Sequence, residues 1–539
     1  MSTLAQALLG ALRDYGVDTV FGIPGNHTIE LYRGLEQAGI RHITSRHEQG
    51  AAFMADGYAR ASGRPGVCLL ISGPGLLNAA TALAQARADS VPVLAISAVA
   101  PRRRLGMGHG TLHELPDQRA AAASFCRWSH TLLHPDNLEE LLHRAFSSFA
   151  CSRPGPVHIE IPLDLMTAPL PSCSARPLPA PPAPAAEALR AAAARLASAQ
   201  RPLLLVGGGA IGAADLLPLL AERLDAPVLN TVNGKGVCPC GHPLAVGGSP
   251  SLPVLARALA DSDCVLAIGT ELGETDYDLL MQPLPNIGAG LIRMDIDPEQ
   301  LTRNAPAELA LVCDARAGVA ALLDALHGTA LHGGRAAGTA RAAELERAIT
   351  RERHWHPEMA AFFAALAHAA PDAVLVGDST RPTYYAAWQY ECESPRSYFH
   401  SASGFGTLGY ALPAALGAKL ASPRPVLALI GDGGLQFTLP ELLTGAEAHL
   451  PVAVIVWCND GYQEIANSMT ASGIPVDSTR VATPDLQQTA ASQHCHYERA
   501  ATLGELQSAL RSALGRDAPT LIEVRQSDFL ASPSGGWYQ

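Results

Sequence analysis

The sequence VLALIGDGG at residues 426–434 and the sequence VAVIVWCNDGY at residues 452–462 decide the fold of this chain. In each, an apolar run with the length and composition of a buried strand ends in a glycine-containing turn. The turns carry Asp432 and Asn459, whose side-chain oxygens suit a hard cation that keeps water and phosphate oxygens as its other ligands. The glycines leave backbone N–H groups free to face anionic oxygen. The two motifs therefore predict a magnesium and diphosphate site at two strand ends.

Length and composition indicate a multidomain protein. Its 539 residues exceed what one hydrophobic core supports, so two or three domains are expected. It is 48% hydrophobic, yet no apolar stretch approaches the roughly 20 residues that span a bilayer. The net charge of −12 disfavours nucleic acid and acidic membrane surfaces as partners. The 11 cysteines show no secreted framework, and residues 1–20 are typical of an amphipathic helix, so we expect a cytoplasmic protein.

Two shifts in composition divide the chain. Residues 168–186 are crowded with proline and alanine, which favours an extended connector, and residues 327–353 are rich in glycine, alanine and arginine. We expect domains at residues 1–168, 186–328 and 352–530. Each alternates short apolar runs with helical patterns, which predicts three α/β domains, each a doubly wound parallel sheet. Such sheets bind ligands at the carboxyl ends of their strands.

The pairing of the two opening motifs resembles the signature of thiamine-diphosphate (ThDP) enzymes, and NDGY at residues 459–462 resembles its decarboxylase version. A Gly-Asp-Gly turn alone also occurs at ordinary strand ends, so the interpretation depends on the pair. The resemblance implies ThDP and Mg²⁺ as cofactors, with the side chains of Asp432 and Asn459 and the carbonyl of Gly461 as metal ligands. It also implies cofactor contacts from Gly431, Gly433, Gly434 and Tyr462.

A second set of motifs lies in the first 75 residues. They are FGIPG at residues 21–25, RHE at 46–48, ADGYAR at 55–60 and SGPG at 72–75. Together they resemble the pyrimidine-binding domain of the acetolactate synthase and 2-oxo acid decarboxylase group. Glu48 by itself could be an ordinary glutamate in the first turn of a helix. The resemblance implies that it contacts the pyrimidine nitrogen N1′ and makes the 4′-amino group available as a base, with Pro24 and Asn26 as further cofactor contacts.

A third set of motifs belongs to the last domain, which the resemblance makes the diphosphate-binding domain, after a central Rossmann-like one. GFGTLGY at residues 404–410 places Leu408 beneath the bent cofactor and gives Gly406 a carbonyl for the 4′-amino group. Ser379 and Thr380 follow another strand-like run and are predicted donors to the diphosphate. In this family one cofactor site combines domains of different subunits, which implies a homodimer at least and commonly a homotetramer.

Members of this group share the loss of carbon dioxide from a 2-oxo acid and differ in what takes the resulting enamine. Acetolactate synthases carry a tryptophan where this chain has Ser468, and they usually bind FAD; whether the central domain here binds a nucleotide stays open. Simple decarboxylases carry a glutamate where this chain has Ile465, so neighbouring Glu464 is a candidate pocket residue. Ile71 stands where benzoylformate decarboxylase has a histidine, which disfavours aromatic substrates.

Histidines are the expected proton donors. His27 lies in a Pro-Gly-Asn-His turn, and His113 lies in the loop GHGTLHELPDQ, where relatives place histidine or glutamine over the thiazolium. Near-neutral imidazoles suit this task, although a surface position is the commoner fate of any one histidine. Both stretches most resemble the 5-guanidino-2-oxopentanoate (2-ketoarginine) decarboxylases. Carboxylates that could pair with such a guanidinium are Glu114, Asp117, Asp460 and Glu464.

We therefore expect a ThDP- and Mg²⁺-dependent enzyme that decarboxylates a 2-oxo acid to an aldehyde. Glu48 would activate the cofactor, and His113 or His27 would handle protons. Two alternatives stay open: carboligation or acyl transfer from the same intermediate, and a non-catalytic relative that binds ThDP without turnover. The intact set of Glu48, Asp432 and Asn459 disfavours the second.

Overall fold

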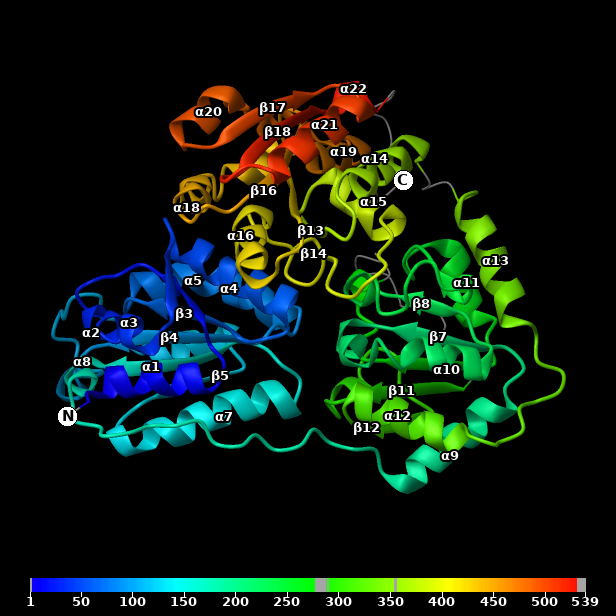
Figure 1. Cartoon of the computed structure of the whole chain (residues 1–539), viewed down its shortest axis with the longest axis horizontal. Coiled ribbons are helices and arrows are strands. Elements are labelled where there is room, and N and C mark those ends of the chain that lie inside the picture. The colour runs from blue at the N-terminus through cyan, green and yellow to red at the C-terminus, as the bar shows by residue number, and fades with distance from the viewer. Residues whose placement is uncertain (1, 277–286, 288–289, 353–355, 531–539) are drawn as a thin grey trace. The chain divides into compact units, whose positions relative to one another are not determined.

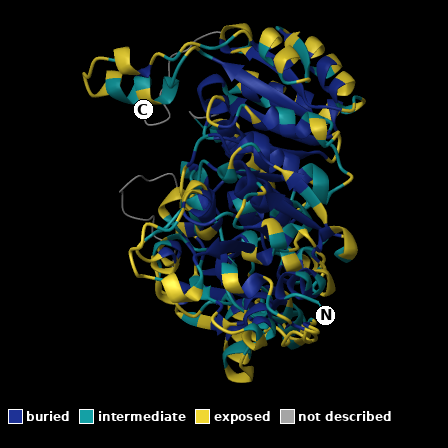
Figure 2. Ribbon diagram, turned by 90° about the vertical axis from the view of Figure 1, so that its left-hand side faces the viewer, coloured by how far each residue is buried: buried dark blue, intermediate teal, exposed yellow. Residues whose placement is uncertain are grey.

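The computed structural model describes residues 2–276, 287, 290–352 and 356–530. The described residues form three six-stranded sheets in which every described pairing between neighbouring strands is parallel (Figure 1). The strands are mostly buried, whereas the flanking helices expose their outer sides (Figure 2). This arrangement confirms the predicted class of three doubly wound parallel sheets.

The first sheet has the strand order β2-β1-β3-β4-β6-β5. Alternate strand side chains such as Val67 and Leu69 pack with helices α1 (Leu4–Asp14) and α7 (Leu138–Cys151), while α4 (Glu48–Ser62) contacts β3 from the other face. The strands are β1 (Thr19–Gly22), β2 (Arg41–Thr44), β3 (Gly66–Leu70), β4 (Val93–Val99), β5 (Trp128–Thr131) and β6 (Val157–Pro162). The order reverses between β1 and β3, so the loops after these two strands face a crevice at the carboxyl edge.

The third sheet repeats this pattern, in the order β14-β13-β15-β16-β18-β17. Its strands are β13 (Val374–Gly377), β14 (Tyr398–His400), β15 (Val426–Gly431), β16 (Val452–Cys458), β17 (His496–Ala500) and β18 (Thr520–Arg525). Here the order reverses between β13 and β15. The loops that carry Asp378 and Asp432 therefore meet at one edge of the sheet.

The central sheet has a different order, β12-β11-β10-β7-β8-β9. Its strands are β7 (Pro202–Val206), β8 (Val228–Asn230), β9 (Ala245–Val246), β10 (Cys264–Ile268), β11 (Leu291–Asp295) and β12 (Leu309–Val312), and α9 (Ala186–Ser198), α10 (Leu217–Leu224) and α12 (Ala315–Leu326) pack on them. At its reversal point a Cβ on Gly209 would lie 2.8 Å from the Cα of Gly269. The two glycine loops therefore touch backbone to backbone.

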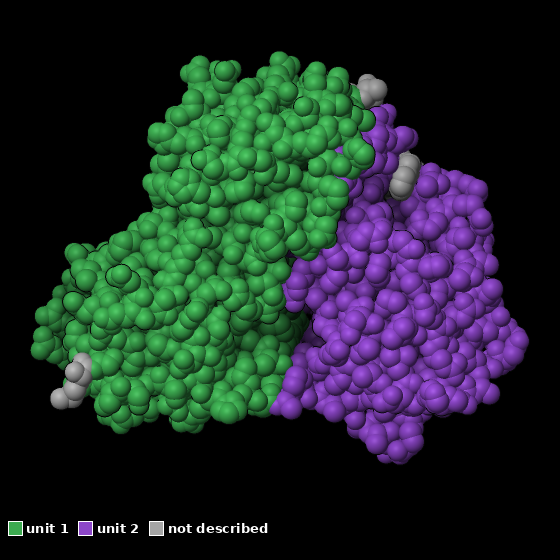
Figure 3. Space-filling view, in the orientation of Figure 1, with its two compact units in different colours: residues 1–179, 368–383, 400–539 green, residues 180–367, 384–399 purple. Residues whose placement is uncertain are grey.

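The chain forms two compact units (Figure 3). Unit 1 comprises residues 1–179, 368–383 and 400–539, and unit 2 comprises residues 180–367 and 384–399. The proline-rich segment lies between α8 (Leu163–Met166) and α9 and contains no helix. The other predicted boundary contains a helix that the sequence did not indicate, α13 (Gly338–Ile349), which buries Ala342 and Ile349. No helix among the described residues combines the length and apolarity needed to cross a membrane.

Two helices hold the sheets of unit 1 together. Helix α4 packs antiparallel against α16 (Ala411–Ala421), because Gly57 faces Ala414 while Met54 faces Gly417. A Cβ on Gly57 or on Gly417 would lie 2.0 Å from the backbone oxygen opposite, so only glycine allows this approach. The start of α4 and the start of α16 consequently lie at opposite ends of the helix pair.

Candidate active site

Asp432 joins the two strand ends that carry the opening motifs. Strands β15 and β16 pair in parallel with Gly431 opposite Trp457, which brings Asp432 beside Asn459. The Asp432 carboxylate is 2% exposed, and its Oδ2 accepts hydrogen bonds from the backbone N–H groups of Asn459 (3.1 Å) and Asp460 (2.8 Å). The hydroxyl of Thr483 donates to the same oxygen at 2.6 Å. The sequence did not predict the contact of Thr483 with Asp432, because Thr483 belongs to no local motif.

The predicted ligand Asn459 keeps its side chain available. Its amide makes no hydrogen bond with the described part of the chain, although its backbone N–H is engaged by Asp432. Gly461 pairs with Arg480 in an isolated antiparallel bridge, and Tyr462 donates its N–H to the Thr479 oxygen at 2.9 Å. The Tyr462 ring covers Gly433, where a Cβ would lie 2.9 Å from the ring. The turn is thus held from behind while the amide of Asn459 faces outward.

Asp378 organises the loop that contains Leu408. Its buried carboxylate accepts hydrogen bonds from the N–H groups of Ser379 (2.9 Å), Gly409 (3.2 Å) and Ala411 (3.0 Å). Burial raises the pKa of this carboxyl to about 6, although the donors from Ala411 and Gly409 oppose the shift. Asp378 therefore fixes the path of the backbone around Leu408, a role that the sequence reading gave to no residue.

The loop itself needs glycine. Gly404, Gly406 and Gly409 have φ values of +70°, +72° and +79°, which L side chains rarely adopt. A Cβ on Gly406 would meet no atom within 4 Å, so the constraint there is conformational and not one of space. Ser379 and Ser401 hold the loop by donating to the Thr407 oxygen at 3.3 and 2.7 Å.

Glu48 is the first residue of α4, where His47 caps the helix by accepting the Gln49 N–H at 3.1 Å. The Asn78 side chain donates to Glu48 Oε2 at 2.9 Å. Asn78 lies in the first turns of α5 (Pro74–Ala88), after the SGPG motif. The sequence motifs assigned no role to Asn78, and the structure makes it the direct partner of Glu48.

Glu441 fixes the entry of the chain into α4 from the third domain. Its side chain is 1% exposed and accepts the backbone N–H groups of Arg46 and His47, both at 3.0 Å. The Thr444 hydroxyl donates to its other oxygen at 2.7 Å. Burial raises the pKa of the Glu441 carboxyl. Glu441 therefore holds the two residues that precede Glu48, across 395 residues of sequence between Arg46 and Glu441.

The structure brings the two candidate histidines together. His27 and His113 lie with ring centroids 5.2 Å apart at an interplanar angle of 64°, and His27 Nδ1 forms a hydrogen bond with the Ser72 hydroxyl at 2.6 Å. Burial lowers the pKa of His27, and His113 lowers it further. His113 has φ +63°, a left-handed conformation that turns its loop over Gly73. Both histidines thus border the crevice after β1 and β3.

The candidate carboxylates for a guanidinium already have partners. Glu464 Oε1 lies 3.6 Å from Arg381 Nε at the start of α15 (Arg381–Gln389). Glu114 accepts two backbone N–H groups within its own loop. Asp117 caps helix α6 (Gln118–Phe125), and Asp460 accepts the Thr483 hydroxyl. The described residues therefore contain no preformed fork among these four.

The predicted site residues form two clusters within unit 1. Glu48 contacts Asn78 near the start of α5, whereas the loop before Leu408 contacts Gln85 and Asp89 at the end of the same helix. Among the described residues no hydrogen bond joins the Glu48 cluster to the Asp432 cluster. The predicted site residues of one chain thus lie in two separate clusters.

Comparison with known proteins decides the family. Models described as the N-terminal TPP binding domain, the central domain and the C-terminal TPP binding domain of thiamine pyrophosphate enzymes match residues 2–121, 189–322 and 378–524. The chain is a thiamine pyrophosphate enzyme by family. This result confirms the predicted resemblance and the predicted cofactor.

Relatives match over nearly the whole length of this thiamine pyrophosphate enzyme. It is 45% identical, over 97% of its chain and 94% of the relative, to a Pseudomonas aeruginosa protein named "probable 2-ketoarginine decarboxylase". It is 31% identical, over 97% of its chain and 94% of the relative, to the acetolactate synthase isozyme 1 large subunit of Escherichia coli. It is 30% identical, over 96% and 91%, to a "probable acetolactate synthase large subunit" of Methanocaldococcus jannaschii.

The residues present fit the cofactor of this family and its usual metal, Mg²⁺. The predicted ligand set has one carboxylate, one amide and one backbone carbonyl, and no cluster of three His, Cys, Asp or Glu side chains occurs in the described part of the chain. Asn459 offers an amide that has no partner among the described residues. Gly433 and Gly434 follow Asp432 in α17 (Asp432–Leu435), and the Gly433 N–H donates to Asp432 Oδ1 at 2.9 Å.

The raised pKa of Asp378 predicts a pH-dependent contribution to stability. Because the native-state pKa, about 6, exceeds the ordinary value of 3.8, this contribution is complete at low pH and is lost as the pH rises through 6. A difference of about 2 pKa units corresponds to about 3 kcal/mol. We expect the destabilisation caused by Asp378→Asn, measured by denaturant unfolding of cofactor-free protein, to shrink by about 2 kcal/mol of this total between about pH 4 and pH 6.

Asp215→Asn is the matched control for this measurement. Asp215 pairs with Arg316 at the surface, and that partner lowers the pKa of its carboxyl. The destabilisation caused by Asp215→Asn should therefore stay nearly constant over the same pH interval. A destabilisation by Asp378→Asn that is constant across the interval would contradict the assignment.

Glu441→Gln tests the positioning of Glu48. The amide loses one acceptor for the N–H groups of Arg46 and His47, so the entry to α4 shifts. Because small displacements of a catalytic group cost up to about a hundredfold, we expect turnover to fall about 10- to 100-fold. Glu447 is 60% exposed and pairs with the Arg46 side chain, so Glu447→Gln should have little effect on turnover. Steady-state kinetics at saturating ThDP and Mg²⁺ compares the two variants, and equal rates would refute the role of Glu441.

Proposed function

We propose that this enzyme decarboxylates 5-guanidino-2-oxopentanoate to the corresponding aldehyde without oxidation, using ThDP and Mg²⁺. One observation carries the choice: the identity to the protein named "probable 2-ketoarginine decarboxylase" is 45% over nearly the whole chain, against 31% to the acetolactate synthase of similar coverage. The paired histidines beside the crevice of the first sheet support a reaction that ends in protonation.

The residues of the chain divide the work between them. Bound ThDP supplies a carbon nucleophile and a positively charged ring that accepts electrons when carbon dioxide leaves. We assign Glu48 to hold a proton at the pyrimidine nitrogen N1′. Asn78 orients its carboxylate by a hydrogen bond, and Glu441 holds the backbone before it by accepting the His47 N–H. Asp432, Asn459 and the carbonyl of Gly461 would hold Mg²⁺, and Leu408 would support the bent cofactor on the loop that Asp378 fixes.

His27 and His113 are assigned the proton that converts the decarboxylated substrate to an aldehyde. Because the pKa of His27 is lowered by burial and by His113, the neutral form of His27 prevails at neutral pH. The Ser72 hydroxyl fixes the ring of His27 through Nδ1, which leaves Nε2 for exchange with substrate. His113, held in its left-handed turn, places its ring 5.2 Å from that of His27.

A panel of 2-oxo acids tests the function. With holoenzyme we expect carbon dioxide and an aldehyde from 5-guanidino-2-oxopentanoate, and slower turnover of pyruvate and benzoylformate. Glu48→Gln keeps the shape of the side chain and removes its charge, so the rate should fall by at least about 100-fold. Retained turnover in this variant would remove Glu48 from the mechanism, and a flat panel would leave only the cofactor assignment.

Carboligation is the second candidate, because acetolactate synthases are among the relatives. The same assays separate the two reactions. A ketol formed from pyruvate in excess of aldehyde would favour carboligation. Aldehyde as the sole product would favour decarboxylation followed by protonation.

We propose further that each active site combines two copies of the chain. Since α4 and α16 run antiparallel, Glu48 and Leu408 of one chain lie about 20 Å apart along the helix axes at 1.5 Å per residue. Two adjoining rings of one cofactor do not span that distance. Large apolar side chains near both clusters are also more than half exposed, namely Met107, Leu112, Phe405, Phe437 and Ile465. A second copy would cover them.

Mixing two inactive variants tests this arrangement. Glu48→Gln and Asp432→Ala damage different halves of the site, so a mixed dimer contains one intact site and one doubly damaged site. After subunit exchange we expect about a quarter of wild-type activity, the statistical yield for a twofold dimer. No recovery, with exchange verified by differently tagged chains, would mean that each chain builds its own site.

The cytoplasm is the proposed location, and a homotetramer of two dimers is the proposed assembly. No disulfide joins any of the 11 cysteines, all of which lie among the described residues, and this supports a reducing compartment. The assembly rests on the resemblance to the family and on the exposed apolar side chains beside the site.

A further inference from the structure

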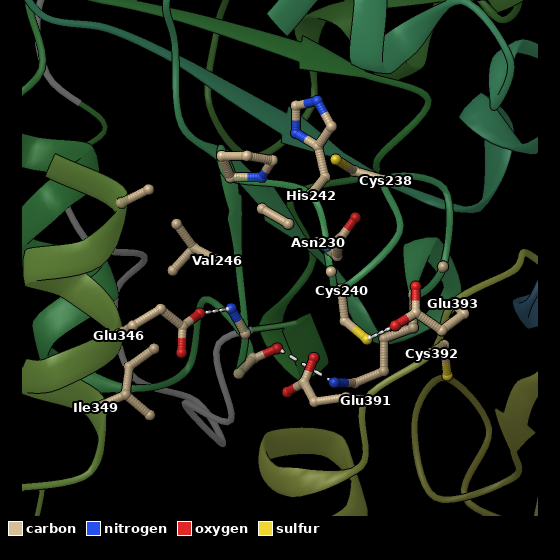
Figure 4. A pocket seen from close by; sticks show the side chains of 18 of the residues that line it. Asn230, Cys238, Cys240, His242, Val246, Glu346, Ile349, Glu391, Cys392 and Glu393 are labelled. Atoms are coloured by element: carbon tan, nitrogen blue, oxygen red, sulfur yellow. Dashed lines mark hydrogen bonds between the residues drawn. The ribbon is translucent and has the colours of Figure 1, made fainter. Parts of the chain in front are cut away.

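Unit 2 contains a cavity of about 600 Å³ that the proposed reaction does not use (Figure 4). Its wall consists of the end of β8 with Asn230, residues 235–248 with the strand β9, helix α13, and residues 388–393 at and after the end of α15. A volume of this size suits a small organic ligand.

The carbonyl oxygens of two amide side chains in the wall have no hydrogen-bond partner among the described residues. Asn230 is 9% exposed, and the unpartnered atom is its Oδ1. Gln389 is 7% exposed; its Nε2 donates to the His356 oxygen at 3.3 Å, while its Oε1 is the unpartnered atom. Burying an unpaired acceptor is unfavourable. Both carbonyl oxygens therefore suit a donor that a ligand supplies.

Charge in the cavity is predominantly negative. Glu346, Glu391 and Glu393 line it from α13 and from the segment after α15, against the cations Lys235 and Arg347. The Lys235 ammonium is already committed, since it is buried and donates to the oxygens of Tyr390 (3.0 Å) and Gly248 (3.4 Å). Burial raises the pKa of the Glu346 carboxyl, and repulsion by Glu391 raises it further. The cavity thus holds carboxylates in excess of free cations.

Two other ligand classes fit less well. Cys238, Cys240 and His242 line the cavity, yet no three His, Cys, Asp or Glu side chains among the residues that the structure describes converge as metal ligands. Cys240 donates to Glu393 Oε1 at 3.0 Å, and burial with this contact raises its pKa to about 12, which keeps the thiol protonated. Nucleotide phosphates would face three carboxylates, against which the wall sets the guanidinium of Arg347 and the committed ammonium of Lys235. An organic cation remains.

We propose that this cavity is a binding site for a small organic cation with several N–H donors, a guanidinium or primary ammonium compound. The carboxylates of Glu391 and Glu393 meet its charge, and the carbonyl oxygens of Asn230 and Gln389 accept its N–H groups. Planar guanidinium groups suit such acceptors because they donate in a fixed fork. The site is separate from the ThDP site and does not depend on the proposed reaction.

Titration of the holoenzyme with L-arginine, agmatine, putrescine and L-citrulline tests the proposal. Citrulline replaces the guanidinium of arginine by a neutral group of nearly the same shape. We expect at least one of the three cations to bind, and citrulline to bind at least tenfold more weakly than arginine. The double variant Glu391→Gln/Glu393→Gln should weaken the cation at least tenfold. Glu187→Gln makes the same change elsewhere in unit 2 and should not affect binding.

The double variant also locates the site. A cation held at the ThDP site would keep its affinity in this variant, because neither residue belongs to the proposed catalytic set. Unchanged affinity in the double variant would overturn the proposal, as would equal affinity for arginine and citrulline or the absence of binding by all three cations. The thermal midpoint and turnover of the double variant verify that it folds.

Discussion

The close approach of α4 to α16 is the constraint on which unit 1 depends. Gly57 and Gly417 let each helix press a backbone carbonyl against the other, and a single methyl group at either position would force the helices apart. The contact is also polar at one end, where the Tyr410 hydroxyl donates to buried Asp56 and Arg60 pairs with the same carboxylate at 2.7 Å. Because the helices are antiparallel, this contact holds apart, within one chain, the two clusters that we propose as half-sites.

The repeated topology of the first and third sheets explains where these half-sites lie. In both sheets the strand order reverses between the first and the third strand, so each sheet opens a crevice at its carboxyl edge. His27 and Ser72 occupy the crevice of the first sheet, and Asp378 and Asp432 occupy that of the third. In the central sheet the order reverses between β7 and β10, where two glycine loops touch. The cavity of unit 2 lies beside the end of β8 and the strand β9.

The buried strands could be predicted from the sequence with good accuracy, because strands covered on both faces are continuous apolar runs. The apolar runs that open the motifs at residues 426–434 and 452–462 coincide with β15 and β16. Helix α13 was missed, since its alanine-rich sequence resembles a linker. Glu441 and Thr483 were missed for another reason. Each acts on a segment far away in sequence through a hydrogen bond that has no local pattern.

Buried carboxylates carry much of the order around the site. Asp378 and Glu441 each accept two or more backbone N–H groups, which offsets part of the cost of removing a charge from water. Their raised pKa values show that burial outweighs these donors. Such groups stay useful only while their donors stay in place, so a shift of the Leu408 loop or of the entry to α4 would leave a charge without compensation. The energetic cost of that state favours a single arrangement of the backbone around Glu48 and Leu408. The proposed site shared between two chains requires such an ordered backbone.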